Sequence, residues 1–529
     1  MEQMAGSKAD ALLFWDGSLG APDAENIQRA LSRPGDLWHA GLRLGMGELP
    51  GLQEAITPNW MLMGDPKTHL EATSWRVSLR ACLLKTEVLR QMGNLRQGFQ
   101  TWEGAALDWG HRCVTRGVFM RHLPWLVPAG VPAQAPIIPL EDSLRFVLGR
   151  FGRFWSRWAL FRAVLAGEVR ADRAWRAWHT VGQEPAPSQP SPYTRTAAPV
   201  EDVSAARVSV LIPTVDRYPY LRTLLGQIRQ QTVRPLDVIV IDQTPRTRRD
   251  PGLEEEFGDL PLRIIYQDEP GQCASRNAGL QAARGDYILF IDDDDEIKPT
   301  LIEAHLQNLH RCRADVSSGV ADEHGAGPLP EAFTFTRISD VFPTNNTLTR
   351  REVLRQSGLF DLAYNRGQRA DGDLGMRIYL SGALMVLNPE ISVFHHHAPS
   401  GGLRLHKARV VTYASSRSRL THRQLLSATE IYLARRYYSP RHSQEMMWHS
   451  VLGTFSIRGG LPRKLLKALI GFVCLPHSLW VLRRRHVEVL ELLKEFPQIP
   501  GLEDQDFAHE SEATHAVRGI AAGRDGSLD

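Results

Sequence analysis

A run of five apolar residues followed by four aspartates constrains the fold of this chain more than any other feature. Residues Tyr287 to Ile291 are aromatic, β-branched or aliphatic, which predicts a short buried strand. Asp292 to Asp295 follow at its carboxyl end, where ligands bind in an open α/β sheet. Adjacent carboxylates are costly unless a cation neutralises them, so the pattern indicates a Mg²⁺ or Mn²⁺ site. The alternative is a solvated acidic turn before a helix that begins at Thr300.

Length and composition indicate a soluble protein of two or more domains. The chain has 529 residues, 43% hydrophobic and 23% charged. The net charge of +3 is too small to indicate a nucleic-acid partner. The five cysteines form no CxxC pair, which argues against a zinc site or a disulfide framework and favours a reducing compartment. The first ten residues lack a basic region followed by an apolar run, so we expect no secretory signal and a cytoplasmic location.

From residue 207 onward, strand patterns alternate with helix patterns. The expected strands are 208–212, 236–241, 262–266 and 287–291, and the expected helices include 220–230 and 275–283. This alternation predicts a doubly wound α/β domain with a mostly parallel, Rossmann-like sheet. Polar residues recur just after the strand ends: Thr214, Asp216, Asp242 and Asp292 to Asp295. In a parallel sheet they would share one edge, so one crevice would collect them.

The phosphate-binding loops of other nucleotide enzymes are absent from the sequence. No GxGxxG follows the first expected strand, and no GxxxxGK is followed by Ser or Thr. A phosphate group bound here therefore needs another counter-charge. A divalent ion on the aspartates would provide it, with Arg276 as a helper.

Taken together and in order, several segments of this region resemble glycosyltransferase family 2. They are Val210 to Thr214, Gln230 to Thr232, Val238 to Asp242, Gly271 to Gly279, Phe290 to Asp295, Asn345 to Asp361 and Ala370 to Arg377. The resemblance covers roughly residues 207–400. It implies the GT-A fold and an inverting enzyme that uses a nucleotide-diphospho-sugar donor.

The resemblance also implies roles for individual residues. The nucleotide-sugar would be bound by Thr214, Asp216, Asp242, Arg276, Asp292 and Asp293. Among these, Thr214 and Asp242 would contact the base and ribose, and Arg276 would lie near the diphosphate. Asp292 and Asp294 would form the DxD motif of the family and bind Mg²⁺ or Mn²⁺, with Asp294 as the principal ligand.

Asp371 matches the aspartate of the Glu-Asp pair that is usual in the family and would be the catalytic base, whereas Ala370 replaces the glutamate. The structural alternative for Asp371 and Asp373 is to cap a helix at 374–380. We assign the cap to Asp373 and the chemistry to Asp371. The base would take the proton of an acceptor hydroxyl, which then attacks C1 of the sugar opposite the leaving diphosphate and inverts its configuration.

Three histidines, His395 to His397, follow an expected strand at 391–394. A lone histidine is usually structural, but three after the base motif could contact a metal or the diphosphate, as a histidine near this point does in some relatives. The sequence does not choose among them, and we take His395 as the candidate metal ligand.

The N-terminal region echoes the second half of the central domain. The matching segments are Lys85 to Gly93 with Arg350 to Gly358, Asp108 to Arg112 with Asp373 to Arg377, and Leu13 to Ser18 with Leu289 to Asp294. Ser18 stands at the position of Asp294, Ala106 stands opposite Asp371, and no nucleotide-binding half precedes them. We therefore expect a degenerate, catalytically silent GT-A-like half-domain that serves packing or acceptor binding, with chance similarity as the alternative.

The expected organisation has six parts. They are the degenerate domain at 1–130, a helical connector at 131–182, a Pro-rich linker at 183–206, the catalytic GT-A domain at 207–402, a helical region at 403–500 and a disordered tail at 501–529. Aromatic residues and arginines at helical spacing in 140–180 predict one amphipathic helix, packed on a neighbouring domain or on a membrane surface.

The expected C-terminal helices are 407–420, 424–438, 442–452, 463–484 and 486–496. The most apolar run, Leu465 to Leu482, is interrupted by Lys467, Pro476 and His477. These interruptions favour a core or interfacial helix over one that spans a membrane.

These patterns predict a metal-dependent inverting glycosyltransferase, cytoplasmic or peripheral at the inner face of the membrane, in bacterial surface glycan or polysaccharide assembly. Its acceptor would be a glycan or a lipid-linked molecule. One alternative is a sugar nucleotidyltransferase, which should carry a Gly-rich basic loop that Pro213 to Tyr218 lacks. The other is a non-catalytic carbohydrate-binding scaffold, against which the intact Asp292, Asp294 and Asp371 argue.

Overall fold

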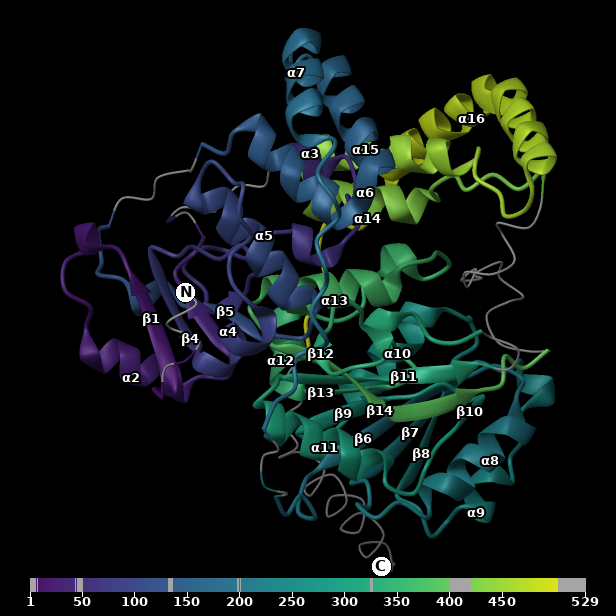
Figure 1. Ribbon diagram of the computed structural model, residues 1–529. Coiled ribbons are helices and arrows are strands. Elements are labelled where there is room, and N and C mark those ends of the chain that lie inside the picture. Colours follow the sequence, from purple (N-terminus) through teal and green to yellow (C-terminus); the bar gives the residue numbers. More distant parts are fainter. Residues whose placement is uncertain are drawn as a thin grey trace, which may run out of the picture.

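The structure is a computed structural model that describes residues 6, 8–42, 44, 51–131, 137–196, 199, 201–323, 327–399 and 420–502. Two sheets lie next to each other, and most of the connector and C-terminal helices gather at one end of the molecule (Figure 1). The larger sheet has nine strands and the smaller has five.

The first half of the larger sheet is parallel, as the sequence predicts. Its strands are β6 (Val208–Thr214), β7 (Asp237–Asp242), β8 (Leu262–Tyr266) and β9 (Tyr287–Phe290). Its helices are α8 (Tyr218–Ile228), α9 (Leu253–Glu256) and α10 (Gln272–Ala282). β6 and β7 are almost wholly buried, which explains why their sequences are continuous apolar runs rather than alternating ones.

The second half of this sheet is mixed. Its strands are β10 (Asp295–Glu296), β11 (Val316–Glu323), β12 (Arg337–Ile338), β13 (Thr347–Arg350) and β14 (Met385–His395). Its helices are α11 (Leu301–Cys312), α12 (Arg351–Ser357) and α13 (Ala370–Leu380). The strand order is β10-β14-β11-β13-β9-β6-β7-β8, with β12 paired to β14. A parallel, Rossmann-like half joined to a mixed half is the GT-A arrangement.

The smaller sheet belongs to the N-terminal region. Its strands are β1 (Ala11–Trp15), β2 (Leu37–His39), β3 (Ala72–Thr73), β4 (Ala81–Lys85) and β5 (Met120–His122). Its helices are α2 (Ala24–Ser32), α3 (Gly51–Glu54), α4 (Thr86–Met92) and α5 (Trp102–Thr115). The strand order β1-β4-β2-β5-β3 repeats the order β9-β13-β11-β14-β12 of the larger sheet, and each neighbouring pair has the same orientation in both.

The register of the two sheets also agrees at the residues that the sequence comparison aligned. Leu13 pairs with Leu83 in the smaller sheet, and Leu289 pairs with Leu348 in the larger one. Local contacts repeat as well: the Oδ2 of Asp36 accepts from Phe119 N at 3.0 Å, and that of Asp315 accepts from Leu384 N at 2.8 Å. Over the residues that the structure describes, the smaller sheet therefore has the frame of the mixed half of the larger sheet, without its parallel half.

The connector forms two helices, so the prediction of one amphipathic helix is wrong. α6 (Leu140–Leu165) bends at Gly152, whose φ is 80°, and α7 (Ala171–Val181) follows after a turn. The Pro-rich segment after α7 is extended but fixed: Glu184 pairs with Arg145 at 2.8 Å, and Arg195 pairs with Asp36 at 2.8 Å.

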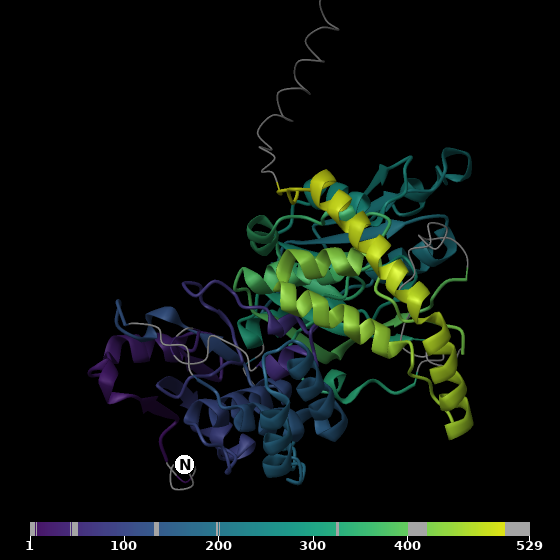
Figure 2. The same ribbon diagram turned by 90° about the horizontal axis from the view of Figure 1, so that it is seen from above.

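Three C-terminal helices are described: α14 (Ala428–Tyr437), α15 (Pro440–Gly453) and α16 (Leu461–Glu495). The expected break near residue 485 is wrong, because α16 continues past it to Glu495. Arg485 donates to the carbonyls of Leu425 and Leu426. Figure 2 shows α16 running alongside α14 and α15. The expected helix at 407–420 and the expected tail fall almost wholly outside the described residues.

Candidate functional site

Three parallel strands bring the predicted polar residues to one edge of the larger sheet. β6 ends at Thr214, which pairs in register with Asp242 at the end of β7. β9 lies on the other side of β6 and leads directly into the acidic turn at 292–295. The grouping at one sheet edge that the sequence predicts is therefore present.

The acidic turn is buried, so a solvated turn is the wrong interpretation. Asp293, Asp294 and Asp295 are each 2–3% exposed. Arg217, from the loop after β6, donates at 2.9 Å to both Asp293 Oδ1 and Asp294 Oδ1, and Thr214 Oγ1 donates to Asp293 Oδ2 at 2.7 Å. Carboxylates this close in a buried turn need such cations to stay charged. Burial nevertheless raises the pKa of Asp293 to about 7.

His395 is the histidine that faces this turn. It lies on β14 opposite Asp295 on β10, and its Nδ1 is 2.8 Å from Asp295 Oδ1 and 3.9 Å from Asp294 Oδ1. Burial alone would lower the pKa of His395, but the hydrogen bond to Asp295 and the nearby carboxylates outweigh it and raise the pKa to about 9. Near neutral pH His395 is therefore protonated beside these carboxylates, and a metal ion that binds it must displace the proton.

The other two histidines point to different partners. His396 Nε2 lies 2.6 Å from Glu296 Oε1, and His397 Nε2 lies 3.2 Å from Glu323 Oε2. Neither has an ion pair with the aspartates at 292–295 within the described residues. Among the three, the geometry favours His395 as the candidate metal ligand.

Arg276 lies on α10 and reaches the first aspartate of the turn. Its Nη2 donates to Asp292 Oδ1 at 3.0 Å, and its guanidinium lies 5.9 Å from the ring of Phe360. Asp292 is the most exposed member of the acidic turn, with 30% of its side chain accessible. The Arg276–Asp292 pair therefore stands at the solvent side of the cluster.

Two more of the predicted nucleotide-sugar contacts, Asp242 and Asp216, differ in burial. Asp242 is 1% exposed and accepts hydrogen bonds from Tyr218 Oη at 2.6 Å and Thr244 N at 2.8 Å. Asp216 adopts a left-handed backbone with φ of 60° and forms an ion pair with Arg248. These contacts fix both side chains before any ligand is present.

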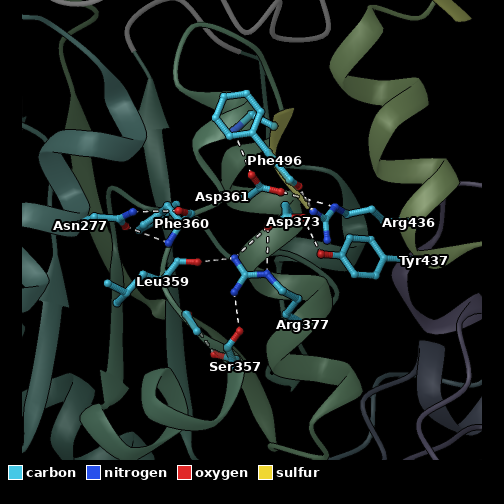
Figure 3. A network of polar contacts seen from close by, with 12 residues as sticks. Asn277, Ser357, Leu359, Phe360, Asp361, Asp373, Arg377, Arg436, Tyr437 and Phe496 are labelled. Atoms are coloured by element: carbon cyan, nitrogen blue, oxygen red, sulfur yellow. Dashed lines mark hydrogen bonds and ion pairs between the residues drawn. The ribbon is translucent and has the colours of Figure 1, made fainter. Parts of the chain in front are cut away.

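The first turn of α13 carries two aspartates with different surroundings. Asp371 is half-buried, and within the described residues its carboxylate has no hydrogen bond or ion pair. Asp373 is fully buried; its Oδ2 accepts from Arg377 Nε and Nη2 at 3.0 and 2.8 Å, and its Oδ1 accepts from Tyr437 Oη at 2.7 Å (Figure 3). Asp373 is therefore an ion-pair partner and not the predicted helix cap; the residue before the helix is Arg369, with φ of 77° and no capping hydrogen bond.

The match to known families falls on this region. Residues 209–371 match the sequence model of glycosyl transferase family 2, a range that spans every predicted site residue except His395. The chain carries a glycosyltransferase family 2 domain.

Curated relatives of the family 2 domain match shorter stretches. The putative glycosyltransferase EpsH of Bacillus subtilis is 35% identical over 102 residues, which are 19% of this chain and 29% of EpsH. The O-antigen biosynthesis protein RfbC of Myxococcus xanthus is 25% identical over 224 residues, 37% of this chain and 18% of RfbC. The chain spans less than a third of the length of each of these two relatives.

Solved structures give weaker similarity. TarS of Staphylococcus aureus in complex with UDP is 18% identical, covers 36% of this chain and 61% of that chain, and has a TM-score of 0.31. GalNAc-T7 with UDP, GalNAc and Mn²⁺ is 14% identical, covers 45% of this chain and 49% of that chain, and has a TM-score of 0.36.

The family 2 domain offers ligand types that suit a divalent ion. Asp292 and Asp294 provide carboxylate oxygens, and His395 provides an imidazole nitrogen. Mn²⁺ binds both kinds of ligand, whereas Mg²⁺ prefers the oxygens. Within the described residues, no three His, Cys, Asp or Glu side chains are already arranged around one metal position. Both oxygens of Asp294 are engaged, by Arg217 and by Ala398 N at 2.7 Å. The donor set fits in chemistry, and Arg217 supplies the counter-charge in the structure.

Sequence reasoning did not identify Arg217. Its position three residues after Thr214, in the loop that follows the first strand, was the available signal. The expected need for a cation beside four carboxylates could have pointed to it, but the direction of a long side chain in a loop is not visible in the sequence.

Proposed function

We propose that this protein transfers a sugar from a nucleotide-diphospho-sugar to an acceptor hydroxyl with inversion of configuration at C1. One observation carries the proposal: within a family 2 domain, one sheet edge holds a buried acidic turn balanced by Arg217, Arg276 and His395. Such a site is suited to a ligand that brings several negative charges together with a divalent ion.

In the proposed donor complex, the nucleoside lies along the ends of β6 and β7. Thr214, Asp216 and Asp242 contact it, while Asp293 stays buried beneath and orients Thr214 through their hydrogen bond. Arg276 is close enough to the surface to exchange Asp292 for a phosphate oxygen. A bound Mg²⁺ or Mn²⁺, held by Asp292, Asp294 and His395, would offset the charge that develops on the leaving diphosphate.

Asp371 is the proposed base. A general base must be ionised and free to accept the proton of the acceptor hydroxyl. The Asp371 carboxylate is free in this sense because it has no partner among the described residues, whereas Asp373 is committed to Arg377 and Tyr437. One displacement by the deprotonated oxygen inverts C1, and no second nucleophile is required.

The proposed setting is bacterial surface glycan or polysaccharide assembly, with a glycan or lipid-linked acceptor. The relative named for O-antigen biosynthesis supports this setting. A cytoplasmic enzyme in peripheral contact with the inner face of a membrane fits such an acceptor.

The test is a screen of the purified protein against UDP-, GDP- and dTDP-sugars, with Mn²⁺, with Mg²⁺ and with EDTA. We expect a metal-dependent rise in melting temperature with one nucleotide class, because a ligand that binds only the native state stabilises it. The anomeric configuration of the product, read by NMR, then tests inversion. No shift with any nucleotide, or a product that retains the configuration of the donor, would contradict the proposal.

A further inference from the structure

Helix α16 presents an apolar surface that no described element covers. The exposed fraction is 61% for Leu469, 66% for Phe472, 74% for Val473 and 56% for Trp480. At helical spacing these residues fall on one side, together with Leu465, which is 62% exposed. We call Leu465, Leu469, Phe472, Val473 and Trp480 the apolar arc.

The opposite side of α16 packs against the protein. Gly471, Ser478 and Leu482 are buried there against the other C-terminal helices, and Lys467 donates to the carbonyls of Leu420 and His422 at 2.8 and 2.5 Å. By length and composition α16 is the one described helix that could cross a membrane. Crossing would strip Lys467 of these carbonyls, at the cost of a buried unpaired charge. A helix that keeps this packed side in place lies along a surface instead.

The charges of α16 are of one sign around the apolar arc. From Leu461 to Val487 there is no Asp or Glu, whereas Arg463, Lys464, Arg483 and Arg484 are exposed; beyond this range Arg484 Nε lies 3.4 Å from Glu488 Oε1. Trp480 ends the arc, and the guanidinium of Arg484 lies 6.0 Å from its ring. Apolar residues followed by tryptophan and arginine are typical of a helix that lies in the interface of a membrane.

Two further features lie at this end of the molecule. A cavity of about 440 Å³ beside α16 is lined by Thr421, His422, Arg423, Leu425, Val481 and Arg485, with no carboxylate. At the same end of the molecule, α6 and α7 expose Phe154, Phe161 and Trp175 by 54–63% (Figure 1). Basic and apolar groups thus recur together at this end.

We propose that α16 docks on a membrane surface that contains anionic lipids. The apolar arc enters the boundary between headgroups and acyl chains, and the arginines contact lipid phosphates. Docking itself is independent of the sugar chemistry. The further claim, that docking brings the family 2 site to a lipid-linked acceptor, rests on the proposed function.

The test is flotation of the full chain with vesicles of phosphatidylcholine alone and of phosphatidylcholine mixed with phosphatidylglycerol. We expect binding to the anionic vesicles that weakens with salt. Phe472→Glu with Trp480→Glu should lower the partition at least about tenfold, since two apolar insertions are lost. Trp102→Glu is the matched control, because Trp102 is 72% exposed on α5, outside the C-terminal helices, and should leave binding unchanged.

A second variant separates charge from folding. Arg483→Glu with Arg484→Glu should abolish the preference for phosphatidylglycerol while the circular dichroism spectrum stays that of the parent protein. Absence of vesicle binding by the parent protein, or equal loss in the Trp102 control, would overturn the proposal. If the Phe472 and Trp480 variant changed in mass from dimer to monomer, the apolar arc would be the contact with a second copy, and the proposal would be overturned. If the parent protein resisted alkaline extraction from the vesicles, α16 would be a spanning helix, and the proposal would also be overturned. Donor binding to the family 2 site is unaffected by any of these outcomes.

Discussion

The two sheets share a frame and differ in the turns that come after their matching first strands. After β1, Asp16 accepts from Ser18 N at 2.9 Å and pairs with Arg80 at 2.7 Å on a partly exposed surface. After β9, Asp294 is 2% exposed and is held by Arg217, which comes from the parallel half that the smaller sheet lacks. The same strand end is a surface turn in one sheet and a buried charge cluster in the other.

This difference shows where the chemistry resides. β1 is an edge strand, whereas β9 is flanked by β6, which supplies Thr214 and leads to Arg217. In the N-terminal region, the shared frame packs against the domain of the larger sheet. Tyr379 Oη donates to Gly64 O at 2.9 Å, and Arg121 Nη2 donates to Gly382 O at 3.0 Å. We propose that the frame serves packing in the N-terminal region and becomes a nucleotide site only with the parallel half.

The largest expected contrast lies in transfer. Asp371→Asn keeps size but removes basicity, so sugar transfer should fall by roughly 10²–10⁴-fold while donor affinity stays the same. Asp16→Asn is the matched change at a carboxylate of the smaller sheet and should leave turnover unchanged. Steady-state transfer and calorimetric donor binding check both. An Asp371→Asn enzyme of normal rate would remove the base from its assigned position.

Buried ion pairs give the next contrast, at equivalent positions on α5 and α13. Asp108 pairs with Arg150 at 2.7 Å, and Asp373 pairs with Arg377 at 2.8 Å. Replacing either aspartate by asparagine leaves a buried guanidinium without its counter-charge and should cost about 3–5 kcal/mol in unfolding free energy. Denaturant titration measures it.

Activity per folded molecule then separates the two positions. Only Asp373→Asn should lower transfer, by up to about 100-fold, because it loosens the helix that carries Asp371. Tyr437→Phe removes one hydrogen bond to Asp373 and is the milder control, at about 1 kcal/mol. A loss of turnover in Asp108→Asn would mean that the smaller sheet takes part in catalysis.

Mild acid should weaken the smaller sheet more than the larger one. Burial lowers the pKa of His39 and His111 to about 3 and also lowers that of His122. Such histidines stay neutral in the folded protein. Their contribution to its folding stability is complete above about pH 6.5 and is lost as the pH falls toward the folded pKa. From pH 7 to 5 the loss should be about 2 kcal/mol for each of His39 and His111.

The readout is hydrogen exchange, corrected for intrinsic rates, of amides in β2, β4 and β5 against those in β11, β13 and β14. The equivalent strands of the larger sheet pack beside one such histidine, His305, whose pKa burial lowers to about 4. Equal loss of protection in both sets of strands would contradict this contrast.

Much of the frame was predictable because its signals are local. The strand at 287–290 followed from a short apolar run, and the helices expected at 220–230 and 275–283 are present as α8 and α10, within three residues of the expected bounds. The repeat was visible because the matched segments lie where strands end and helices begin. The clustering of Thr214, Asp242 and the acidic turn followed from parallel pairing alone.

The remaining features depend on partners remote in sequence. Asp373 was predicted to cap α13 but is buried, because Tyr437 of α14 covers it. α16 was expected to break near residue 485 but continues to Glu495, and Arg485 within it donates to carbonyls that precede α14. Contacts between residues so far apart in the sequence leave no signal in the local sequence pattern.

The most direct test of the central claim is calorimetry of nucleoside diphosphates with Mn²⁺ on the parent protein, Asp294→Ala and Asp16→Ala. The claim is that the larger sheet alone holds the donor site. We predict Mn²⁺-dependent binding to the parent protein and to Asp16→Ala with the same affinity, and no Mn²⁺-dependent binding to Asp294→Ala with its fold intact. Unchanged binding to Asp294→Ala, or its loss in Asp16→Ala, would contradict the account.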